Sequence, residues 1–538
     1  MLMSTMPPPS ALGAPEKFSE WRPVQEAAAL RHMSSEQRFV MSAMPTGAGK
    51  SLMYVMVALM TGQRTCILTS TKGLQSQLMR DFREAGMVDV RGMNAYNCVG
   101  LSEGEFGDPV SESCDSGPCR SGAPCSFRQN GCLYFDAVRE ASEARIVVTN
   151  YAYYMYMQGH GKGIGTFDRL VLDEAHDAVG WLCEFLSNEI TETELSLVGS
   201  SVPGNDLTPH EWRKWAEAQG GSVERRLEIV RGLIVDTQTG LGASPGIIRS
   251  LRREARQLAV LGDKLEVLRD LDAGWVIERS PRLVKFSIVW PAKHAERCLF
   301  RGIPHVDFVS ATIRPKTAEL LGVPKSDLDF ADYPSDFPAK RRPVIHVPTV
   351  RMNHHNTPAD EQVWLEVMDQ IISDRRDRKG IVHTVSYKRR DLIMAHSVHR
   401  DILLAHTPAT TRSVFEEFKR AQGCRVLVSP AATTGWDFPA EECEYQIVTK
   451  IPFPDLSSAV MKARAAQDKK YGAFMAVLTL VQMVGRGMRS AEDQCETLVL
   501  DDNIKWFLWQ YREFLPRWFT AACTSVGEGR LPKPLPKM

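Results

Sequence analysis

The sequence lacks an excess of charge of either sign. Its 538 residues contain 65 Lys and Arg against 65 Asp and Glu, so the formal net charge at pH 7 is zero. A strongly basic chain would indicate nucleic acid and a strongly acidic chain a cationic partner, because a net charge attracts its opposite over long distances. Neither applies here, so any charged ligand has to be bound by a local groove.

Long apolar runs are also missing. Stretches such as residues 55–60 fall far short of the ~20 apolar residues that cross a bilayer. The first 18 residues place prolines where a secretory signal needs a charged start and an apolar segment. We therefore expect a cytoplasmic protein that does not bind a membrane.

Repeats and low-complexity tracts are absent as well. Hydrophobic residues make up 43% of the chain and charged residues 24%, which excludes collagenous and wholly disordered classes. At ~150 residues per domain the chain has room for about three or four globular units.

Cysteine is abundant in one place. Five of the 12 cysteines lie within the 35 residues from 98 to 132, at positions 98, 114, 119, 125 and 132. Because disulfides are rare in the cytosol, a metal ion or a metal cluster is the leading explanation for this window. We expect the other seven cysteines to be mostly small buried hydrophobic residues.

Short β-rich runs recur in two series, and most have the uninterrupted apolar character of strands in a parallel sheet. The first series comprises residues 39–41, 66–69, 145–149, 170–173 and 306–310. The second, after a Pro-rich stretch at 333–348, comprises residues 380–384, 425–429, 446–449 and 497–501. Helical patterns among several of these runs predict two α/β domains in tandem.

Two stretches interrupt the alternation. Residues 184–272 are rich in Leu, Glu and Arg at helical spacing and poor in strand signals, which predicts a helical insertion. The cysteine window, between residues 89 and 145, is loop-like in its Gly, Pro and Ser content.

The segment Thr46-Gly-Ala-Gly-Lys-Ser51 has the parts of a phosphate-binding loop. It follows an extended run and precedes a helical stretch; its glycines let backbone N–H groups approach a phosphate, Lys50 suits the terminal phosphates and Ser51 suits Mg²⁺. Met44 stands where the general pattern has its first glycine, which disfavours a small kinase or a GTPase. The alternative is a chance Gly turn before a helix.

Three further motifs follow in order. Asp173-Glu174-Ala175-His176 ends an apolar strand, where one carboxylate can hold Mg²⁺ and the next can orient a water. Ser310-Ala-Thr312 also follows a strand. The third motif is Gln482-Met-Val-Gly-Arg486-Gly-Met-Arg489, in which the two arginines are spaced i and i+3 and so lie on one helix face. Two guanidinium groups there could stabilise the charge that develops on a γ-phosphate. An ordinary helix with surface salt bridges would have the same spacing.

The motif order resembles that of superfamily-two helicases. It runs through Arg22-Pro-Val-Gln25, the Lys50 loop, Thr69-Ser-Thr71, the DEAH box at 173–176, Ser310-Ala-Thr312, Thr434-Gly-Trp-Asp437 and the motif at 482–489. Arg91-Gly-Met-Asn-Ala-Tyr-Asn-Cys98 and Cys132-Leu-Tyr resemble the two ends of the iron–sulfur domain of the XPD/DinG family. The likeness covers residues 18 to about 504, and the compact length resembles phage-borne members. Met93 departs from the family, which usually has Arg at that position.

The resemblance implies an α/β fold with two tandem RecA-like parallel-sheet motor domains, and an iron–sulfur insertion and a helical arch insertion in the first. The expected boundaries are 1–97, 133–182 and 273–335 for motor domain 1, 98–132 for the iron–sulfur domain, 183–272 for the arch and 336–538 for motor domain 2.

The resemblance also implies roles for single residues. Lys50 and Ser51 would bind phosphates and Mg²⁺, Asp173 the metal, Glu174 the attacking water, and Arg486 and Arg489 the γ-phosphate. The expected nucleotide-binding residues are Arg22, Gln25 (at the adenine edge), Thr46, Gly47, Ala48, Gly49, Lys50, Ser51, Asp437 and Gln482. Ser70, Thr71, Ser386 and Thr433 would lie towards the DNA backbone, with Phe453 as a base-stacking platform or a core residue.

The family has four cluster ligands where this chain has five cysteines. The close spacing of the family's last three ligands favours Cys98, Cys119, Cys125 and Cys132, with Cys114 as the substitute for Cys119. Zinc is the competing interpretation; structural zinc sites favour tight C-x₂₋₄-C pairs, whereas the intervals here are mostly wider, and all-thiolate ligation also suits a [4Fe–4S] cluster.

The expected function is therefore a monomeric ATP-dependent DNA helicase that moves 5′→3′ on single-stranded DNA, acts at duplex junctions, and uses ATP, Mg²⁺ and a [4Fe–4S] cluster. The alternative is an ATP-switched nucleic-acid-binding protein without unwinding activity, with zinc in place of the cluster. Two basic runs, residues 375–379 and 388–390, are candidates for the DNA-binding surface, or else solvated helix faces.

Overall fold

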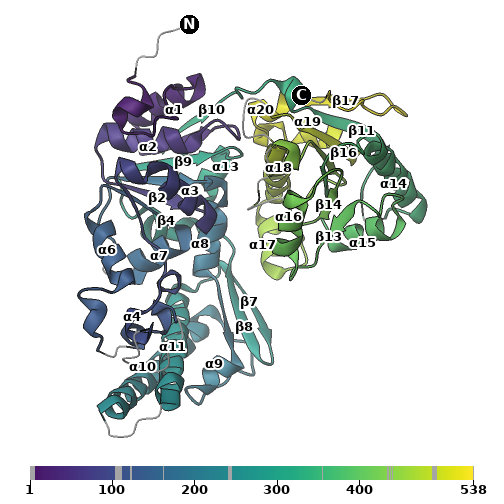
Figure 1. The fold of residues 1–538 in the computed structure, drawn as a ribbon. Helices are drawn as coiled ribbons and strands as arrows, with labels where there is room; N and C mark the ends of the chain where they lie inside the picture. The colour runs from purple at the N-terminus through teal and green to yellow at the C-terminus, as the bar shows by residue number, and fades with distance from the viewer. Residues whose placement is uncertain are drawn as a thin grey trace.

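The computed structural model describes residues 6–102, 112–121, 124–160, 163–239, 245–353, 355–432, 436, 438, 440–487 and 493–536. Two seven-stranded parallel sheets dominate it, and each forms the centre of one body, which we call domain 1 and domain 2. Figure 1 shows domain 1 in purple and blue beside domain 2 in green and yellow. The prediction of two RecA-like parallel-sheet domains is confirmed.

The sheet of domain 1 has the strand order β10-β1-β9-β5-β2-β4-β3. Its strands are β1 (Phe39–Ala43), β2 (Thr65–Thr69), β3 (Met87–Asp89), β4 (Ile146–Asn150), β5 (Arg169–Asp173), β9 (His305–Ser310) and β10 (Leu328–Asp332). The helices around it are α1 (Pro23–Ser34), α2 (Lys50–Thr61), α3 (Lys72–Phe82), α6 (Leu133–Glu143), α7 (Tyr151–His160), α8 (Ala178–Leu186), α12 (Ala292–Ala295) and α13 (Pro315–Leu320).

The sheet of domain 2 has the order β13-β14-β12-β15-β16-β11-β17. Its strands are β11 (Val344–Val350), β12 (Gly380–His383), β13 (Leu403–Ala405), β14 (Val426–Ser429), β15 (Tyr445–Val448), β16 (Glu496–Asp501) and β17 (Cys523–Ser525). Its helices are α14 (Pro358–Ser373), α15 (Tyr387–His396), α16 (Thr411–Arg420), α17 (Ala459–Gln467), α18 (Tyr471–Val484), α19 (Ile504–Gln510) and α20 (Arg517–Thr520).

The central strands are those whose sequences read as apolar runs, and the strands that the pattern missed lie mainly at sheet edges. β1, β2 and β5 are buried at every residue. β10, by contrast, is half-buried throughout, and β17 is partly exposed. Edge strands carry polar residues because one side of them has no neighbour, so they give a weaker periodic signal.

Between β5 and β9 the chain leaves domain 1 and forms a smaller body. It contains α9 (Glu192–Ser196), the long antiparallel helices α10 (Pro209–Thr239) and α11 (Pro245–Val267), and an antiparallel sheet of β6 (Asn188–Thr191), β8 (Leu283–Ile288) and β7 (Trp275–Ser280). The β7–β8 hairpin, which the expected boundaries place in motor domain 1, thus pairs with β6 of the expected arch, because its antiparallel strands do not extend a parallel sheet. The boundaries otherwise remain a prediction.

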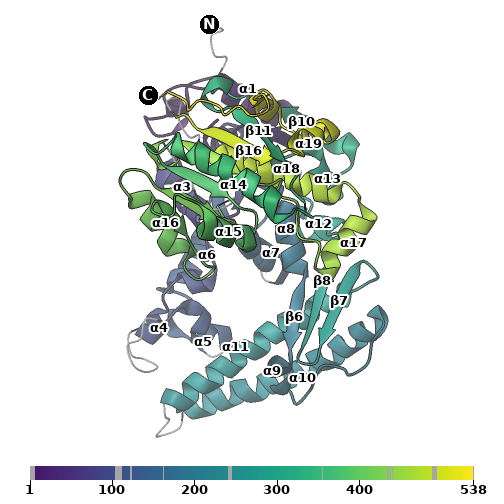
Figure 2. The same ribbon diagram turned by 90° about the vertical axis from the view of Figure 1, so that its right-hand side faces the viewer.

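The cysteine segment, residues 98–132, is described at 98–102, 112–121 and 124–132, and this described part packs against α11. Its short helices α4 (Val99–Ser102) and α5 (Pro118–Ser121) lie beside α11 in Figures 1 and 2. Arg120 on α5 forms a 3.4 Å ion pair with Asp263 on α11 and a 2.9 Å hydrogen bond to the Tyr156 hydroxyl of α7. The two insertions therefore support one another. In the part of the chain that the structure describes, no helix is long and apolar enough to cross a bilayer.

Candidate nucleotide site

The phosphate-binding loop lies at the end of β1 and leads into α2. Gly47 and Gly49 have φ angles of 77° and 75°, in the left-handed region that favours glycine. A Cβ on Gly49 would also clash with the side-chain amide of Gln25, which would have to move aside. Lys50 and Ser51 form the first turn of α2, whose amino end favours anions.

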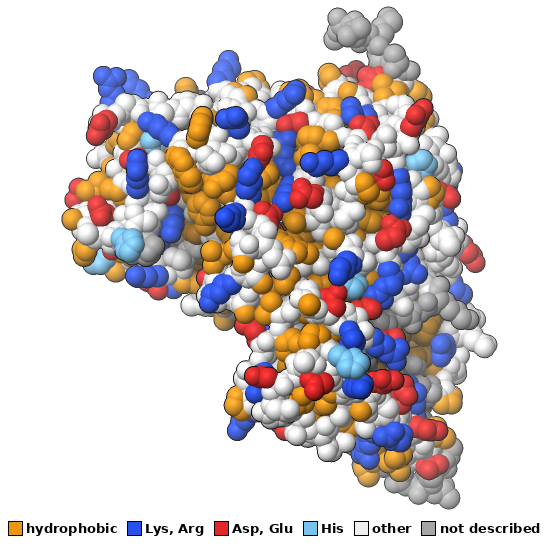
Figure 3. Space-filling model, turned by 180° about the vertical axis from the view of Figure 1, so that it is seen from behind, with side chains coloured by type: hydrophobic (Ala, Val, Ile, Leu, Met, Phe, Trp, Pro, Cys, Tyr) orange, Lys and Arg blue, Asp and Glu red, His pale blue; other side chains and the backbone are white. Residues whose placement is uncertain are grey.

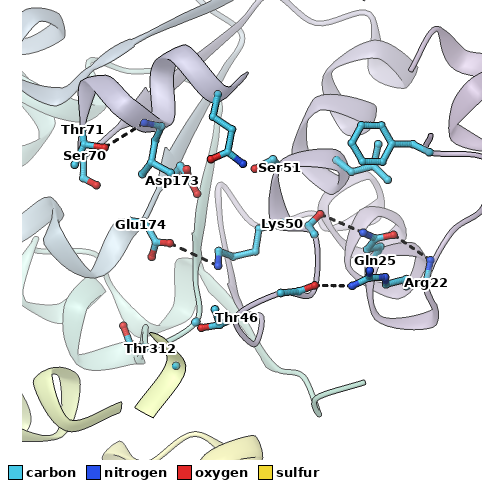
Figure 4. A pocket seen from close by; sticks show the side chains of 18 of the residues that line it. Arg22, Gln25, Thr46, Lys50, Ser51, Ser70, Thr71, Asp173, Glu174 and Thr312 are labelled. Atoms are coloured by element: carbon cyan, nitrogen blue, oxygen red, sulfur yellow. Dashed lines mark hydrogen bonds and ion pairs between the residues drawn. The ribbon is translucent and has the colours of Figure 1, made fainter. Parts of the chain in front are cut away.

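Asp173 and Glu174 stand at the end of β5, opposite this loop. Glu174 has a φ of 48°, a conformation that costs a non-glycine residue about 1–3 kcal/mol, and its Oε1 lies 3.6 Å from Lys50 Nζ. Figure 4 shows the lysine and the glutamate facing one another across the pocket. Burial and the neighbouring Glu174 carboxylate raise the pKa of Asp173 to about 7, against the opposing effect of Lys50.

A chain of contacts joins the DEAH box to the end of β9. Ser310 Oγ donates a 3.2 Å hydrogen bond to Glu174 Oε2, and it shares a 2.6 Å hydrogen bond with His176 Nδ1. Since the single hydroxyl proton of Ser310 points to Glu174, His176 donates in the second bond. Burial opposes protonation of His176, but the Asp177 and Glu174 carboxylates raise its pKa overall.

Helix α18 of domain 2 reaches this same place. The Gln482 side-chain amide contacts His176 Nε2. A Cβ on Gly485, at the end of α18, would lie 2.8 Å from Thr46 Oγ1 in the phosphate-binding loop. The 482–485 end of the motif therefore touches both the DEAH box and the loop, and links the two domains.

The amino-terminal side of the pocket is built by Arg22 and Gln25. Gln25 Nε2 donates to the Gly49 carbonyl at 3.3 Å, and its Oε1 accepts from the Arg22 backbone N–H at 3.0 Å. The Arg22 guanidinium donates to the Gly47 carbonyl at 2.5 Å. Both side chains thus stabilise the loop by binding its backbone carbonyls, and Figure 4 shows them beside it.

These groups line one cavity of ≈ 880 Å³, which is in the size range of small-molecule sites. The sequence-predicted residues among its lining are Arg22, Gln25, Thr46, Gly47, Gly49, Lys50, Ser51, Ser70, Thr71, Asp173, Glu174 and Gln482. Ser70 and Thr71, expected towards DNA, thus border the same cavity. Ala48 is buried just outside this lining.

The other predicted residues either lie outside the described part of the chain or lie away from this cavity. Asp437, Thr433 and Arg489 lie outside the described residues, as does the side chain of Arg486. Ser386 is at the amino end of α15, where its hydroxyl accepts from the Arg389 N–H. Phe453 is 42% exposed and packs against Phe507 at a ring distance of 5.5 Å.

Tyr54 was missed by the sequence motifs. It is buried on α2 next to Ser51 and Asp173, and burial followed by the Asp173 charge raises the pKa of its hydroxyl well above the ordinary value. It is three residues from Ser51 along one helix, so the helical interval was the available signal.

The five cysteines of the segment line one small cavity, together with Met93, Phe127 and Phe135. Cys114 interacts with both Cys98 and Cys132, and Cys119 interacts with both Cys125 and Cys132. The hydrogen bond from Cys114 lowers the pKa of Cys98 to about 6, whereas burial and the Cys125 thiol raise the pKa of Cys119 to about 12. No group of three or more His, Cys, Asp or Glu side chains that could hold a metal ion occurs among the described residues.

The run 375–379 does not form a basic surface. The Arg375 side chain is fully buried and makes a two-pronged pair with Glu496, with distances of 2.8 and 3.0 Å, while Lys379 is buried against carbonyls of α16. Arg375, Arg378 and Lys379 are all buried. The interpretations of this run as a DNA-binding surface or as a solvated helix face are therefore wrong for these three residues. In Figure 3, Lys and Arg side chains alternate with acidic ones, and hydrophobic side chains gather where the two domains meet.

Comparisons with known proteins agree with the fold. Residues 18–189 match the family described as type III restriction enzyme, res subunit, and residues 371–522 match the helicase C-terminal domain. No curated protein matches the chain.

Among solved structures, an XPD helicase is 13% identical with a TM-score of 0.61, and covers 94% of this chain and 100% of its own. Xpd4 of S. tokodaii is 11% identical with a TM-score of 0.56, again over 94% and 100%. Identities this low show a shared fold alone.

Fold and pocket together define a P-loop protein with two RecA-like domains. Within that class, the two family matches support a nucleic-acid helicase of superfamily two that hydrolyses ATP, and the structural likeness places its fold with XPD.

Proposed function

We propose that this chain is an ATP-dependent DNA helicase that translocates 5′→3′ on single-stranded DNA and needs a [4Fe–4S] cluster for duplex separation. The observation that carries the motor function is the meeting of Lys50 and Glu174 of domain 1 with Gln482 and Gly485 of domain 2 around one cavity. A site shared by two domains can couple nucleotide binding to domain closure. Substrate and polarity rest on the resemblance to the XPD/DinG family.

In this proposal the chain positions ATP and a water. The backbone N–H groups of the loop and Lys50 hold the β- and γ-phosphates, and Glu174, fixed by Ser310, orients the attacking water. Ser51 and Asp173 would hold Mg²⁺, which when bound neutralises charge on the phosphates. His176 Nδ1 lies 3.3 Å from Glu174 Oε2 and its Nε2 contacts Gln482, so this histidine connects the catalytic carboxylate to domain 2.

The cysteine segment has the donor set of an iron–sulfur site. Five thiols border one cavity, and a Cβ on Gly117 would lie 3.0 Å from Cys98 Sγ, so glycine leaves room beside that sulfur. Cys98, Cys125 and Cys132 would be ligands together with Cys119 or Cys114. A bound cluster would supply a rigid cross-link between α4, α5 and α6. Thiolate-only ligation suits such a cluster.

Strand displacement on DNA duplexes with 5′ or 3′ single-stranded tails tests the function. We expect ATP-dependent displacement of 5′-tailed substrates only, by a monomer. Displacement of 3′-tailed duplexes alone would contradict the polarity, and preference for RNA duplexes would contradict the substrate. ATP-dependent binding without displacement, in a protein that contains zinc and no iron or sulfide, would support the alternative of an ATP-switched binding protein.

A further inference from the structure

Helix α18 links the nucleotide cavity to a second contact between the domains. Its carboxyl end brings Gln482 and Gly485 to the DEAH box and the phosphate-binding loop. The other end, 14 residues and roughly 20 Å away, begins at Tyr471. The helix is apolar and mostly buried, so it moves as a rigid element.

Arg464 of α17 packs beside Tyr471 and reaches out of domain 2. Its Nε donates to the Val289 carbonyl at 2.9 Å, and one terminal nitrogen donates to the Ile288 carbonyl at 3.2 Å and to Cys183 Sγ at 3.1 Å. The guanidinium lies 5.7 Å from the ring centre of Trp290 and 5.8 Å from that of Tyr471. The Arg464 guanidinium thus connects α17 with α8 and with the end of β8.

The three elements belong to different working parts of the molecule. Cys183 is on α8, which directly follows the DEAH box. Ile288 ends β8, whose sheet is continuous with the long helices α10 and α11 through β6 and β7. Arg464 therefore lies where three parts of the molecule meet. They are domain 2, helix α8, and the β6–β8–β7 sheet, which leads into α10 and α11 of the expected arch.

Other contacts fix α17 in the same place. Gln467 Oε1 accepts a 2.8 Å hydrogen bond from Trp290 Nε1, and Lys316 of α13 forms a 2.9 Å ion pair with Asp468. Among the described residues, the partners of the Arg464 guanidinium are carbonyl oxygens, a thiol, a thioether and a hydroxyl, and no carboxylate pairs with it. Several fixed acceptors in different directions require the planar fork of arginine rather than the single ammonium of lysine.

We propose that Arg464 is a positioning residue that transmits the nucleotide state, sensed at the far end of α18, to the β6–β8–β7 sheet and the arch. A movement of α18 towards the phosphate-binding loop displaces Tyr471 and α17, and Arg464 carries that displacement to β8. This proposal rests on the proposed helicase function, since it assigns the step that couples ATP hydrolysis to strand separation.

Hydrogen–deuterium exchange with and without a non-hydrolysable ATP analogue and Mg²⁺ tests the coupling without requiring helicase activity. In the wild type we expect the analogue to change exchange both in the loop, residues 46–53, and in residues 283–290. In Arg464→Met the loop response remains, whereas the response of 283–290 falls by about fivefold or more, as for a lost coupling between sites. Arg464→Lys should restore only part of it.

The controls separate coupling from folding. Arg412→Met removes an arginine of the same domain whose side chain is 87% exposed, and should leave both responses unchanged. If Arg464→Met fails to fold, Gln467→Leu removes only the bond to Trp290 and should weaken the 283–290 response alone. Equal responses of 283–290 in wild type and variants, no response there in the wild type, or joint loss at both places in a folded variant would each overturn the proposal.

Duplex separation gives the second readout. We expect Arg464→Met to retain DNA-stimulated ATP hydrolysis within about twofold and to separate about fivefold fewer base pairs per ATP. Unchanged base pairs per ATP would contradict the coupling role. If the wild type does not unwind DNA, the helicase proposal fails, and the exchange experiment still decides the role of Arg464.

Discussion

The nucleotide cavity and the cysteine segment are held in place by different means. Around the cavity, five-residue strands and a 12-residue helix fix the positions of Lys50 and Asp173. In the cysteine segment, a single turn carries Cys114 and a helix of four residues carries Cys119, while Cys98 directly precedes the four-residue α4. Such short helices have no stability of their own. The first site is thus preformed by the fold, whereas the second depends on what joins its thiols.

The largest expected effect is loss of hydrolysis without loss of structure in Lys50→Ala. Removing the ammonium that holds the terminal phosphates should lower the rate of ATP hydrolysis roughly 10³-fold, while the melting temperature changes little because the Lys50 ammonium faces the cavity. Steady-state hydrolysis with calorimetry checks both. Lys325→Ala, an exposed lysine of domain 1, is the matched control, and hydrolysis at the wild-type rate in Lys50→Ala would refute the assignment.

Glu174→Gln should slow hydrolysis by about 10²–10⁴-fold while ATP still binds, because the amide keeps the shape but cannot act as a base. Nucleotide binding by fluorescence titration, alongside single-turnover hydrolysis, distinguishes the two steps. A normal rate would remove Glu174 from the mechanism.

For Cys98→Ser we expect the opposite result, a loss of local structure with ATP hydrolysis retained. Loss of a ligand should unfold the segment locally and abolish duplex separation, whereas ATP hydrolysis persists because the cavity lies outside the segment. Iron and sulfide analysis, the visible absorption of the anaerobically purified protein and limited proteolysis of residues 98–132 are the measurements. Cys66→Ser, a buried cysteine of β2, is the control. A colourless wild type with stoichiometric zinc would refute the cluster and leave the motor assignment intact.

Most of the cavity could be predicted from local sequence, because the phosphate-binding loop, the DEAH box and the motif at 310–312 each lie at a strand end that is followed by a turn. Lys50, Asp173 and Ser310 follow apolar runs in order, and parallel strands bring their carboxyl ends to one edge. The contacts that join distant segments have no such signature. Nothing near Arg464 in the sequence indicates that it contacts Cys183 or Val289. Likewise Glu496, the acidic partner of the buried Arg375, is 121 residues away from it in the sequence.

A smaller effect is expected at the contact between the domains. In Gly485→Ala the new Cβ would lie 2.8 Å from Thr46 Oγ1, so either Thr46 of the loop or α18 has to shift, and we expect roughly a tenfold lower ATP hydrolysis with an unchanged fold. Gly472→Ala, at the other end of α18, meets nothing within 4 Å and serves as control. Equal hydrolysis in the two variants would show that the close approach does not matter.

The smallest effect distinguishes the two cysteines that compete for one ligand position. Cys114 is buried and interacts with Cys98 and Cys132, whereas Cys119 is half-buried and interacts with Cys125 and Cys132. The family spacing favours Cys119 as the ligand, whereas the deeper burial of Cys114 favours the opposite assignment. Following the spacing, we expect Cys119→Ser to lose iron and Cys114→Ser to keep it, at a cost of about 1 kcal/mol in stability from the lost thiol contacts.

Iron content per chain and thermal unfolding of both variants decide between them. Iron retained in Cys119→Ser and lost in Cys114→Ser would reverse the assignment. Iron retained in both variants would show that either thiol can complete the set. That last outcome would sharpen the comparison with the nucleotide cavity, because a short, locally unstable segment can rearrange to offer a second ligand, whereas Lys50 is held in place between a buried strand and a helix.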